Sequence, residues 1–388
     1  MATLDGLVWW AALVLSAAAI AYRLLALAAV GLWRPVESPG WPRPPRVTLL
    51  KPLCGPEDGL EEALVSFLSQ RVTSPVRFVF GVAQADDPAL AVAKDVAARF
   101  PECDVALVVE GQNHGGSPKV GNLINMAKGG LSEVVVTSDS DIVIRPGVLQ
   151  QLIDALSAPG YGAVTSLYQG RPDRSGDRLR TFGAWYLNYW SLPMAAVHAR
   201  LGGLNVTYSP LTAIRGEVLA QGGGFAAIAW HMTDDAALGR LVLGTGWKLG
   251  FAPNIVETMV NDASPRMLFD HERRWSQTDR SEHPVGNLAT IVSHPGPVPL
   301  LLLLNPGWLA ALGIALPVLL RWLIARLVEH RFGRPETCSR MGLAGTWLRD
   351  LVCFAVWIAG MTSSRVDWRG NRFAMARGGR LVEVGDSA

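Results

Sequence analysis

The chain begins with a long run of apolar residues. Residues 7–33 are apolar apart from Arg23 and a few small polar side chains. Because a helix needs roughly 20 apolar residues to cross a bilayer, this run predicts a transmembrane helix. A cleavable signal peptide is the alternative, but such a peptide has basic residues before a shorter apolar core. Here Asp5 precedes the run, which argues against that alternative.

The residues after this run predict the side of the membrane on which the chain continues. Arg34, Arg43 and Arg46 follow it. Because basic residues near a membrane helix favour the cytoplasmic side, we expect the downstream domain to face the cytoplasm. Five of the residues from 34 to 45 are prolines, which predicts a stiff, extended linker.

Residues 46–295 alternate between strand-like and helix-like patterns. Short apolar runs rich in β-branched residues predict strands, and the segments between them have helical spacing. This alternation predicts an α/β fold with a mostly parallel sheet. Ligands of such sheets bind at the carboxyl ends of the strands, so acidic residues that follow a strand are candidate site residues. The expected strands are Val47–Leu50, Val76–Val82, Val105–Val109, Val134–Thr137 and Ala163–Leu167, and the expected helices are Leu60–Ser69, Ala89–Arg99, Leu123–Ala127 and Val148–Ala155.

Apolar runs return near the C-terminus at Leu300–Leu320, interrupted by Asn305-Pro306-Gly307, and at Leu348–Met361. Arginine clusters lie between the runs and after the second, so two complete spans would place these clusters on opposite sides of the membrane. A re-entrant hairpin or an interfacial helix is the alternative. The aromatic-rich stretch Trp185–Leu204 predicts either an interfacial or a buried helix. The expected parts are a transmembrane helix (7–33), a proline-rich linker (34–45), a soluble-looking domain (46–295), membrane segments (296–362) and a basic cytoplasmic tail (363–388).

The composition excludes several classes of protein. Hydrophobic residues make up 49% of the chain and charged residues 18%, which is unusual for a purely soluble protein. The net charge is only +2, and no basic run is interleaved with aromatic residues, so we expect no nucleic-acid partner. None of the four cysteines lies in a CxxC pair, which argues against a structural zinc site.

The strongest chemical pattern follows the predicted strand Val134–Thr137. Asp139 and Asp141 come directly after it, so two carboxylates lie just past the end of a buried strand. Mg²⁺ in proteins usually takes one or two carboxylates together with phosphate oxygens of a substrate. We therefore predict that Asp139 and Asp141 hold Mg²⁺ or Mn²⁺, which would act as a Lewis acid on a diphosphate leaving group.

Two other acidic pairs stand just before predicted helices. Asp87 follows the strand Val76–Val82 and could bind the base or ribose of a nucleotide, although an ordinary helix N-cap is the alternative. Asp234 and Asp235 precede residues 236–243. A carboxylate there could act as a general base on an acceptor hydroxyl, and acids favoured by the helix dipole are the alternative.

Basic residues supply the remaining candidates. Lys119, which has glycines nearby, could contact a diphosphate, and a solvated surface lysine is the alternative. Further along are His271, Arg274 and Trp275. A guanidinium pairs well with phosphate, and an indole gives a flat wall for a sugar. An amphipathic helix with surface charges is the alternative here.

The order of these motifs resembles the ceramide glucosyltransferase family. The resemblance covers nearly the whole chain, from about Trp9 to the segment 366–370, and is greatest to the branch that adds N-acetylglucosamine to bacteriohopanetetrol in hopanoid biosynthesis. The ordered pieces are the N-terminal apolar run, Lys51-Pro52-Leu53-Cys54-Gly55, Asp86-Asp87-Pro88, Asp139-Ser140-Asp141, Asp234-Asp235, Arg274-Trp275 and the C-terminal apolar runs.

This resemblance implies a GT-A fold and an inverting, metal-dependent reaction. It implies that Asp87 lies in the nucleotide pocket, that Asp139 lies at the metal and diphosphate, and that Asp235 is the catalytic base. Arg274 and Trp275 match the end of the family's (Gln/Arg)-x-x-Arg-Trp motif. The chain departs from the family pattern at His271, where Gln or Arg is usual, and at Gln84, where Asp is common.

We therefore expect an enzyme that transfers N-acetylglucosamine or glucose from a UDP-sugar to a lipid hydroxyl. Bacteriohopanetetrol is the expected acceptor and ceramide the alternative. Besides the metal ligands, Asp87, Lys119, Asp234, His271, Arg274 and Trp275 are expected to bind the nucleotide-sugar. The scarcity of lysine among the basic residues is typical of a GC-rich bacterium, so we expect an inner-membrane protein. A processive polysaccharide synthase, which needs more spans, and an inactive membrane scaffold are further alternatives.

Overall fold

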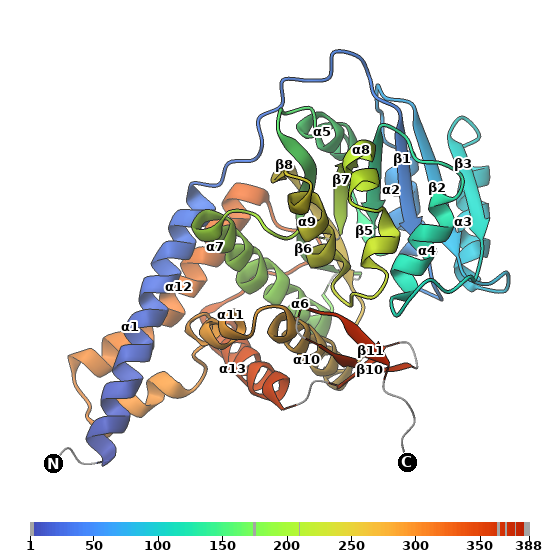
Figure 1. Ribbon diagram of the computed structural model, residues 1–388. Coiled ribbons are helices and arrows are strands. Elements are labelled where there is room, and N and C mark those ends of the chain that lie inside the picture. The colour runs from blue at the N-terminus through green and yellow to red at the C-terminus, as the bar shows by residue number, and fades with distance from the viewer. Residues whose placement is uncertain are drawn as a thin grey trace, which may run out of the picture. The chain divides into compact units, whose positions relative to one another are not determined.

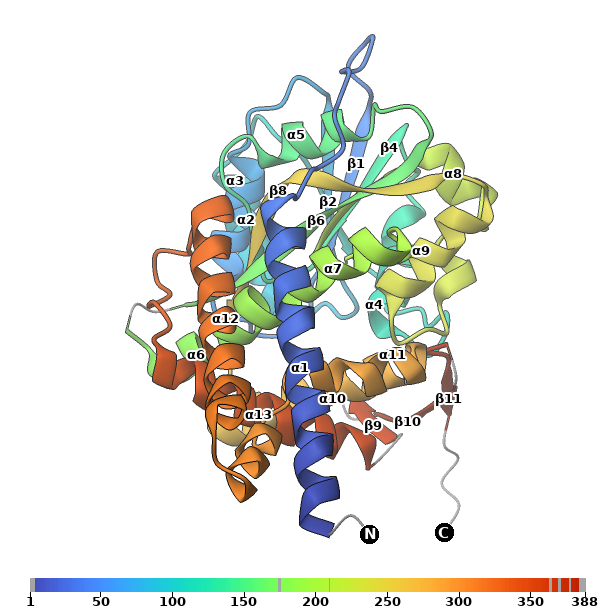
Figure 2. The same cartoon turned by 90° about the vertical axis from the view of Figure 1, so that its left-hand side faces the viewer.

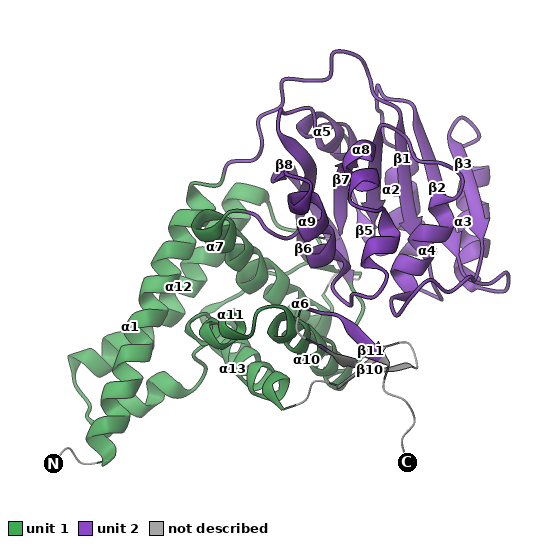
Figure 3. Ribbon diagram, viewed as in Figure 1, with its two compact units in different colours: residues 1–33, 170–203, 260–371 green, residues 34–169, 204–259, 372–388 purple. Residues whose placement is uncertain are grey.

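A computed structural model describes residues 4–173, 176–208, 210–362, 365–368, 371–376 and 378–383. The chain forms two compact units, each assembled from segments that are distant in the sequence (Figure 3). The helical unit consists of residues 1–33, 170–203 and 260–371, and the sheet unit consists of residues 34–169, 204–259 and 372–388. Residues 170–203 and 260–295 thus cluster with the long apolar helices rather than with the rest of residues 46–295.

The sheet unit contains a mixed eight-stranded sheet with the order β3-β2-β1-β4-β7-β6-β8-β5. β1 is parallel to β2 and β4, and β2 is parallel to β3. β7 is antiparallel to β4 and β6, and β5 is antiparallel to β8. The bounds are β1 Val47–Pro52, β2 Val76–Val82, β3 Asp104–Val109, β4 Val134–Ser138, β5 Ile142–Val143, β6 Tyr161–Pro172, β7 Leu211–Arg215 and β8 Lys248–Val260.

The predicted α/β fold with a mostly parallel sheet is confirmed. All five predicted strands are present, although β6 extends well beyond Ala163–Leu167. Within this sheet, the strands that the sequence did not reveal are β5, β7 and β8. Each of these takes part in an antiparallel pairing.

Helices cover both faces of the sheet (Figure 1). Both faces of the sheet are apolar, as alternate residues of β1 show. Val47 and Leu49 pack into one core cluster, whereas Leu50 packs into another on the opposite face. Strands buried on both faces read as nearly continuous apolar runs. The first cluster includes α2 (Leu60–Leu68), α3 (Pro88–Ala98) and α5 (Val148–Ala155), and the second includes α4 (Pro118–Ala127), α8 (Gly216–Gln221) and α9 (Asp234–Gly244).

Within the described residues, three helices are long and apolar enough to cross a membrane. They are α1 (Leu4–Gly31), α12 (Trp308–Phe332) and α13 (Leu343–Met361), all in the helical unit. α1 and α12 lie side by side (Figure 1, Figure 2). The apolar run Leu300–Leu320 is divided at its Asn305-Pro306-Gly307 interruption. Its first part is the 3₁₀ helix η4 (Val298–Leu304), and α12 begins only after Pro306 and Gly307, which break the helix.

The aromatic stretch near residue 190 forms three consecutive helical segments. These are α6 (Arg178–Tyr186), the π-helical η1 (Leu187–Ser191) and α7 (Leu192–Gly202). Tyr189 and Trp190 are buried, so the central part is core, whereas Leu201 is exposed. The unit also contains α10 (Pro265–Glu282), α11 (Pro284–Ala289), the 3₁₀ turn η3 (Thr290–Val292) and β9 (Arg365–Trp368).

The C-terminal segment contributes two short strands to the sheet unit. β10 (Asn371–Met375) pairs antiparallel with β11 (Leu381–Glu383). The amide of Leu381 donates to the carbonyl of Trp230, 2.8 Å away, and that of Met232 donates to the carbonyl of Gly379, 2.9 Å away. These bonds tie the end of the chain to the segment that leads into α9.

Buried charges join the apolar helices. Arg23 of α1 donates to Asp350 of α13, 3.3 Å away, and to the carbonyl of Ser293. The indole of Trp190 donates to the same carboxylate over 3.1 Å. Arg321 of α12 donates to the carbonyl of Ser293, and its guanidinium lies 4.7 Å from the ring centre of Trp190. Charged side chains within membrane helices face the bundle interior and find partners there, as these do.

Asp350→Ala should destabilise the helical unit, because it leaves the Arg23 guanidinium buried without its counter-ion. We expect the free energy of unfolding in detergent to fall by about 3–5 kcal/mol. The double variant Arg23→Leu with Asp350→Leu should regain most of that loss. Glu61→Ala, which removes the exposed ion pair of Glu61 with Arg99, should change stability by less than about 1 kcal/mol. A small effect of Asp350→Ala would contradict the assigned pairing.

Candidate functional site

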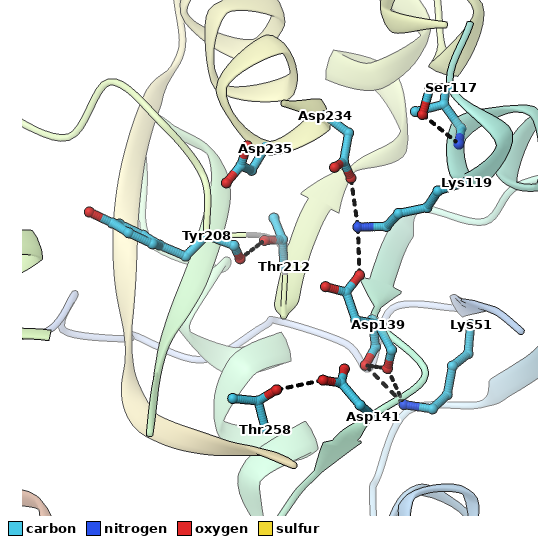
Figure 4. A network of polar contacts seen from close by, with 12 residues as sticks. Lys51, Ser117, Lys119, Asp139, Asp141, Tyr208, Thr212, Asp234, Asp235 and Thr258 are labelled. Carbon is cyan, nitrogen blue, oxygen red and sulfur yellow. Dashed lines mark hydrogen bonds and ion pairs between the residues drawn. The ribbon is translucent and has the colours of Figure 1, made fainter. Parts of the chain in front are cut away.

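The candidate site lies where β4 ends. The strand is buried along its whole length and delivers Asp139 and Asp141 to the turn before β5. Figure 4 shows the two carboxylates directed to different partners. That of Asp139 meets the ammonium of Lys119, whereas that of Asp141 accepts a 2.6 Å hydrogen bond from Thr258 of β8.

Lys119 joins two of the predicted acids. Its ammonium lies 2.5 Å from the carboxylate of Asp139 and 2.8 Å from that of Asp234. Local sequence explains this placement. Ser117 caps α4, with its hydroxyl accepting from the amide of Val120, so Lys119 stands in the first turn. Asp234 is the first residue of α9, so two helix starts converge on the turn after β4.

The electrostatics of this cluster keep the lysine charged. Burial alone would lower the pKa of Lys119, but the nearby carboxylates of Asp139 and Asp234 outweigh it and raise the pKa above its ordinary value. Burial raises the pKa of Asp139 to about 6 against the opposing effect of Lys119, and the charges of Asp234 and Asp141 add to the rise. The cluster thus holds a permanent cation beside a carboxylate whose ionised form is disfavoured.

A pocket opens at this cluster. Lys119, Asp139 and Asp234 supply its charged groups, and Leu123, Phe225 and Leu238 are among its apolar walls. An apolar pocket with a few converging polar groups at the carboxyl edge of an α/β sheet is the usual form of a ligand site.

Lys51 is a site residue to which the sequence analysis gave no role. It is fully buried at the end of β1, and its ammonium donates to the carbonyl of Asp139 over 2.5 Å and to the hydroxyl of Ser138 over 3.2 Å. It also lies 4.3 Å from the ring centre of Phe67. Burial lowers its pKa to about 7, although Asp141 and Asp139 oppose this. Lys51 therefore anchors the backbone of the turn. The clues in the sequence were its place beside the apolar run Val47–Leu50 and its position at the start of Lys51-Pro52-Leu53-Cys54-Gly55, one of the motifs that carry the resemblance.

Asp235 and Asp234 are neighbours with different surroundings. Asp234 points to Lys119, whereas Asp235 points away from it (Figure 4). One carboxylate oxygen of Asp235 accepts from the amide of Ala236, 2.8 Å away, and its backbone carbonyl accepts from the hydroxyl of Thr207. The start of α9 thus presents two carboxylates in two directions.

Asp87 is an N-cap, as the alternative interpretation held. Its carboxylate accepts from the amide of Ala89 over 2.9 Å and from the amide of Gly55 over 3.0 Å. It therefore fixes the loop after β1 against the start of α3. The role of Asp87 at a nucleotide stays a prediction.

His271, Arg274 and Trp275 lie on α10 of the helical unit. The ring of His271 is 4.2 Å from that of Trp275, and its Nδ1 is 3.3 Å from the carboxylate of Asp262. Trp275 in turn stacks on Tyr186 at 5.9 Å. The sheet unit therefore brings together Lys119, Asp139, Asp141, Asp234 and Asp235, and the helical unit holds the aromatic and basic candidates.

The carboxylates of the turn have the chemistry that a hard divalent cation requires. Asp139 and Asp141 supply oxygen ligands, which Mg²⁺ and Mn²⁺ prefer. The Lys119 ammonium already stands between Asp139 and Asp234 as a cation. Among the described residues no group of three His, Cys, Asp or Glu side chains is arranged to hold a metal. One or two protein carboxylates suffice when substrate phosphates complete the shell, so the residues fit a metal bound together with a diphosphate.

Comparison of the sequence with known proteins identifies a family and similar relatives. Glycosyl transferase family 21 matches residues 10–381. The chain is 23% identical over 348 residues to ceramide glucosyltransferase 3 of Caenorhabditis elegans, covering 87% of this chain and 74% of that protein. It is 23% identical over 243 residues to ceramide glucosyltransferase 1 of the same organism, covering 60% and 50%.

The fold is similar to that of a solved mannosyltransferase. This is PcManGT from Pyrobaculum calidifontis, in complex with GDP-Man and Mn²⁺, with a TM-score of 0.55 and 16% identity. The match covers 91% of this chain and 97% of that one. It shows a GT-A-like fold, as the sequence predicted.

Lys51→Met should lower the catalytic rate, because it removes the ammonium that holds the Asp139 carbonyl but keeps the buried stem. A displacement of about 1 Å at a site can cost on the order of 10²-fold, and we expect a loss of that order in kcat, measured with a nucleotide-sugar donor. Lys128→Met is the matched control, since Lys128 pairs with Glu110 at the exposed end of α4. If both variants kept the wild-type rate, Lys51 would have no positioning role.

Proposed function

Since the chain belongs to glycosyl transferase family 21, we propose that it transfers a sugar from a UDP-sugar to the hydroxyl of a lipid. The observation that carries the proposal is the Lys119–Asp139–Asp234 cluster at the carboxyl edge of a GT-A-like sheet. The three long apolar helices support a membrane-bound enzyme with a lipid acceptor. We place the catalytic part on the cytoplasmic side, where nucleotide-sugars are made.

The donor's diphosphate needs cationic partners. Lys119 keeps its charge between two acids and is the candidate within the sheet unit. His271 and Arg274 are proposed as further partners of the diphosphate, Trp275 is proposed as a wall for the sugar, and Asp87 is proposed to seat the nucleotide. A divalent metal held by Asp139 and Asp141 would neutralise charge on the leaving diphosphate. The Mn²⁺ of the mannosyltransferase complex supports such a cofactor.

Asp235 is the proposed general base. In a single displacement the acceptor oxygen attacks the anomeric carbon, its proton passes to the Asp235 carboxylate, and UDP leaves with the bonding electrons of the sugar–phosphate bond. The configuration at the anomeric carbon is inverted, and no covalent sugar–enzyme intermediate forms. The separate orientation of Asp235 supports this role, because Lys119 already engages Asp234.

The acceptor is proposed to be a ceramide-type lipid. The relatives named above are ceramide glucosyltransferases, which favours ceramide over the bacteriohopanetetrol expected from the sequence. Both acceptors present a hydroxyl on a neutral lipid. The mechanism proposed for Asp235 is the same for either one.

Asp235→Ala should nearly abolish turnover and leave nucleotide binding intact, because it removes only the proton acceptor. General-base catalysis is worth roughly 10²–10⁴ in rate. The test compares the rate of lipid glycosylation with UDP affinity measured by calorimetry. Asp86→Ala, at an exposed position of the α3 loop, is the control. A variant that keeps more than about a tenth of the wild-type rate would place the base elsewhere.

Removal of divalent metal should stop the transfer reaction reversibly. Treatment with EDTA is expected to abolish activity, and Mn²⁺ or Mg²⁺ should restore it, because the diphosphate otherwise leaves with uncompensated charge. Asp139→Asn should prevent restoration at metal concentrations that rescue the wild type. Full activity in EDTA would rule out the metal. Mass spectrometry of the lipid products would distinguish a glycosylceramide from a glycosylated hopanoid.

A further inference from the structure

The helical unit contains a second pocket. All of its lining residues belong to that unit and come from α6, η1, α7, α10, α11, α13 and the turns around them. Polar and aromatic side chains share its wall, among them Asp279, Asn287, His294, Trp190 and Trp357. The mechanism proposed above uses none of these residues.

The polar atoms of this pocket are not satisfied by the protein. Oδ1 of Asn287 and Nε2 of His294 are buried and have no hydrogen-bond partner among the described residues. The amide nitrogen of Asn287 donates to the carbonyl of Ser276, whereas no described residue donates to its oxygen. A buried polar group without a partner is costly, and two in one pocket indicate a ligand that supplies hydrogen bonds.

The charges of the pocket select a neutral ligand. Burial, helped by Arg321, Arg23 and Arg349, lowers the pKa of His294 to about 3, so the imidazole is uncharged. Asp279 lines the pocket, and burial raises the pKa of its carboxyl to about 7, with the charge of Glu282 adding to the rise. No lysine or arginine among the described residues lines the pocket, so no cationic side chain there would bind a phosphate. Asp279, the Asn287 oxygen and a neutral imidazole together match the hydroxyl groups of a neutral ligand.

Aromatic side chains form another part of the wall. Trp190 and Trp357 line it, and Trp357 belongs to α13, a helix long and apolar enough to cross a membrane. The indole nitrogen of Trp357 donates to the backbone carbonyl of Asn287, and Phe354 stacks on the indole with 6.1 Å between ring centres, which fixes the ring in place. Aromatic walls beside hydroxyl-binding groups suit a molecule with a polar head and a hydrocarbon body.

The pocket also adjoins the segment with the basic and aromatic candidates. Glu272, Ser276 and Asp279 line it at positions i, i+4 and i+7 of α10, which lie on one face of a helix. Trp275 precedes Ser276 directly, and Arg349 pairs with Glu272 without itself lining the pocket. The helix proposed to contact the donor therefore continues into the wall of this pocket.

We propose that this pocket binds the neutral, hydroxyl-bearing headgroup of the acceptor lipid, a proposal that rests on the function proposed above. Asp279 and the oxygen of Asn287 accept hydrogen bonds from the headgroup, and the indoles pack against the adjoining hydrocarbon. Ceramide and a hopanoid polyol share this chemistry.

Asp279→Asn tests the proposal with the smallest change. At pH 8, above the pKa of about 7, the Asp279 carboxyl is mostly ionised. A hydrogen bond to a charged group contributes about 1.5–3 kcal/mol, so at that pH we expect the KM for a short-chain ceramide to rise by roughly 10-fold or more. The KM for the UDP-sugar and the kcat at saturating ceramide should stay unchanged. Asp270→Asn is the matched control, since Asp270 lies on the same helix but pairs with Arg273. Equal KM values for ceramide in both variants would overturn the proposal.

Binding without turnover separates this proposal from the proposed function. A fluorescent short-chain ceramide should bind to wild type and to Asp235→Ala alike in the absence of donor, and more weakly to Asp279→Asn and to His294→Phe. Ceramide 1-phosphate should bind more weakly than ceramide to the wild type. Tighter binding of the phosphate, or equal ceramide binding by all variants, would overturn the proposal. Intact binding without any sugar transfer would instead count against the proposed function alone.

Discussion

The candidate site depends on one interaction, the double ion pair of Lys119 with Asp139 and Asp234. Asp139 and Asp234 come from segments nearly a hundred residues apart, and like charges repel strongly where water is scarce. A cation between them makes their close approach favourable. The same ion pairs hold the start of α9 against the turn after β4, and thereby set the direction in which Asp235 projects. The position of the proposed base therefore follows from a lysine that is not itself the base.

The helical unit also contains buried charges, which are paired with other residues. Arg23, Arg321 and Arg349 are fully buried among apolar helices, where an unpaired charge is costly. Asp350, Glu272 and backbone carbonyls near η3 accept their hydrogen bonds. These bonds fix how α1, α12, α13 and α10 are positioned along one another. Apolar packing alone specifies this poorly. Charges inside the unit thus fix the helix that carries His271 and Trp275.

Elements that local sequence patterns encode were predicted, whereas elements that depend on contacts between distant residues were missed. Strands β1 to β4 and their helices were predicted because apolar runs alternate with segments of helical spacing. Each candidate acid stands at a strand end or a helix start. Antiparallel β7 and β8 were missed, because their pairing depends on partners far along the chain. Lys51 was missed because a lysine at the end of a strand is ordinarily exposed. Its burial results from Phe67 and from the turn carbonyls that it binds, which only the folded chain brings together.

Charge balance explains why this site would require a metal during catalysis. Asp139, Asp141 and Asp234 carry three negative charges when ionised, and Lys51 and Lys119 carry at most two positive ones. A nucleoside diphosphate adds further negative charge to the same pocket, and its departure concentrates that charge on the leaving oxygen. Lys51 cannot turn toward it, because its ammonium holds the turn carbonyl of Asp139. A divalent cation held by Asp139 and Asp141 would restore the balance, and Lys119 could then interact with the phosphate oxygens.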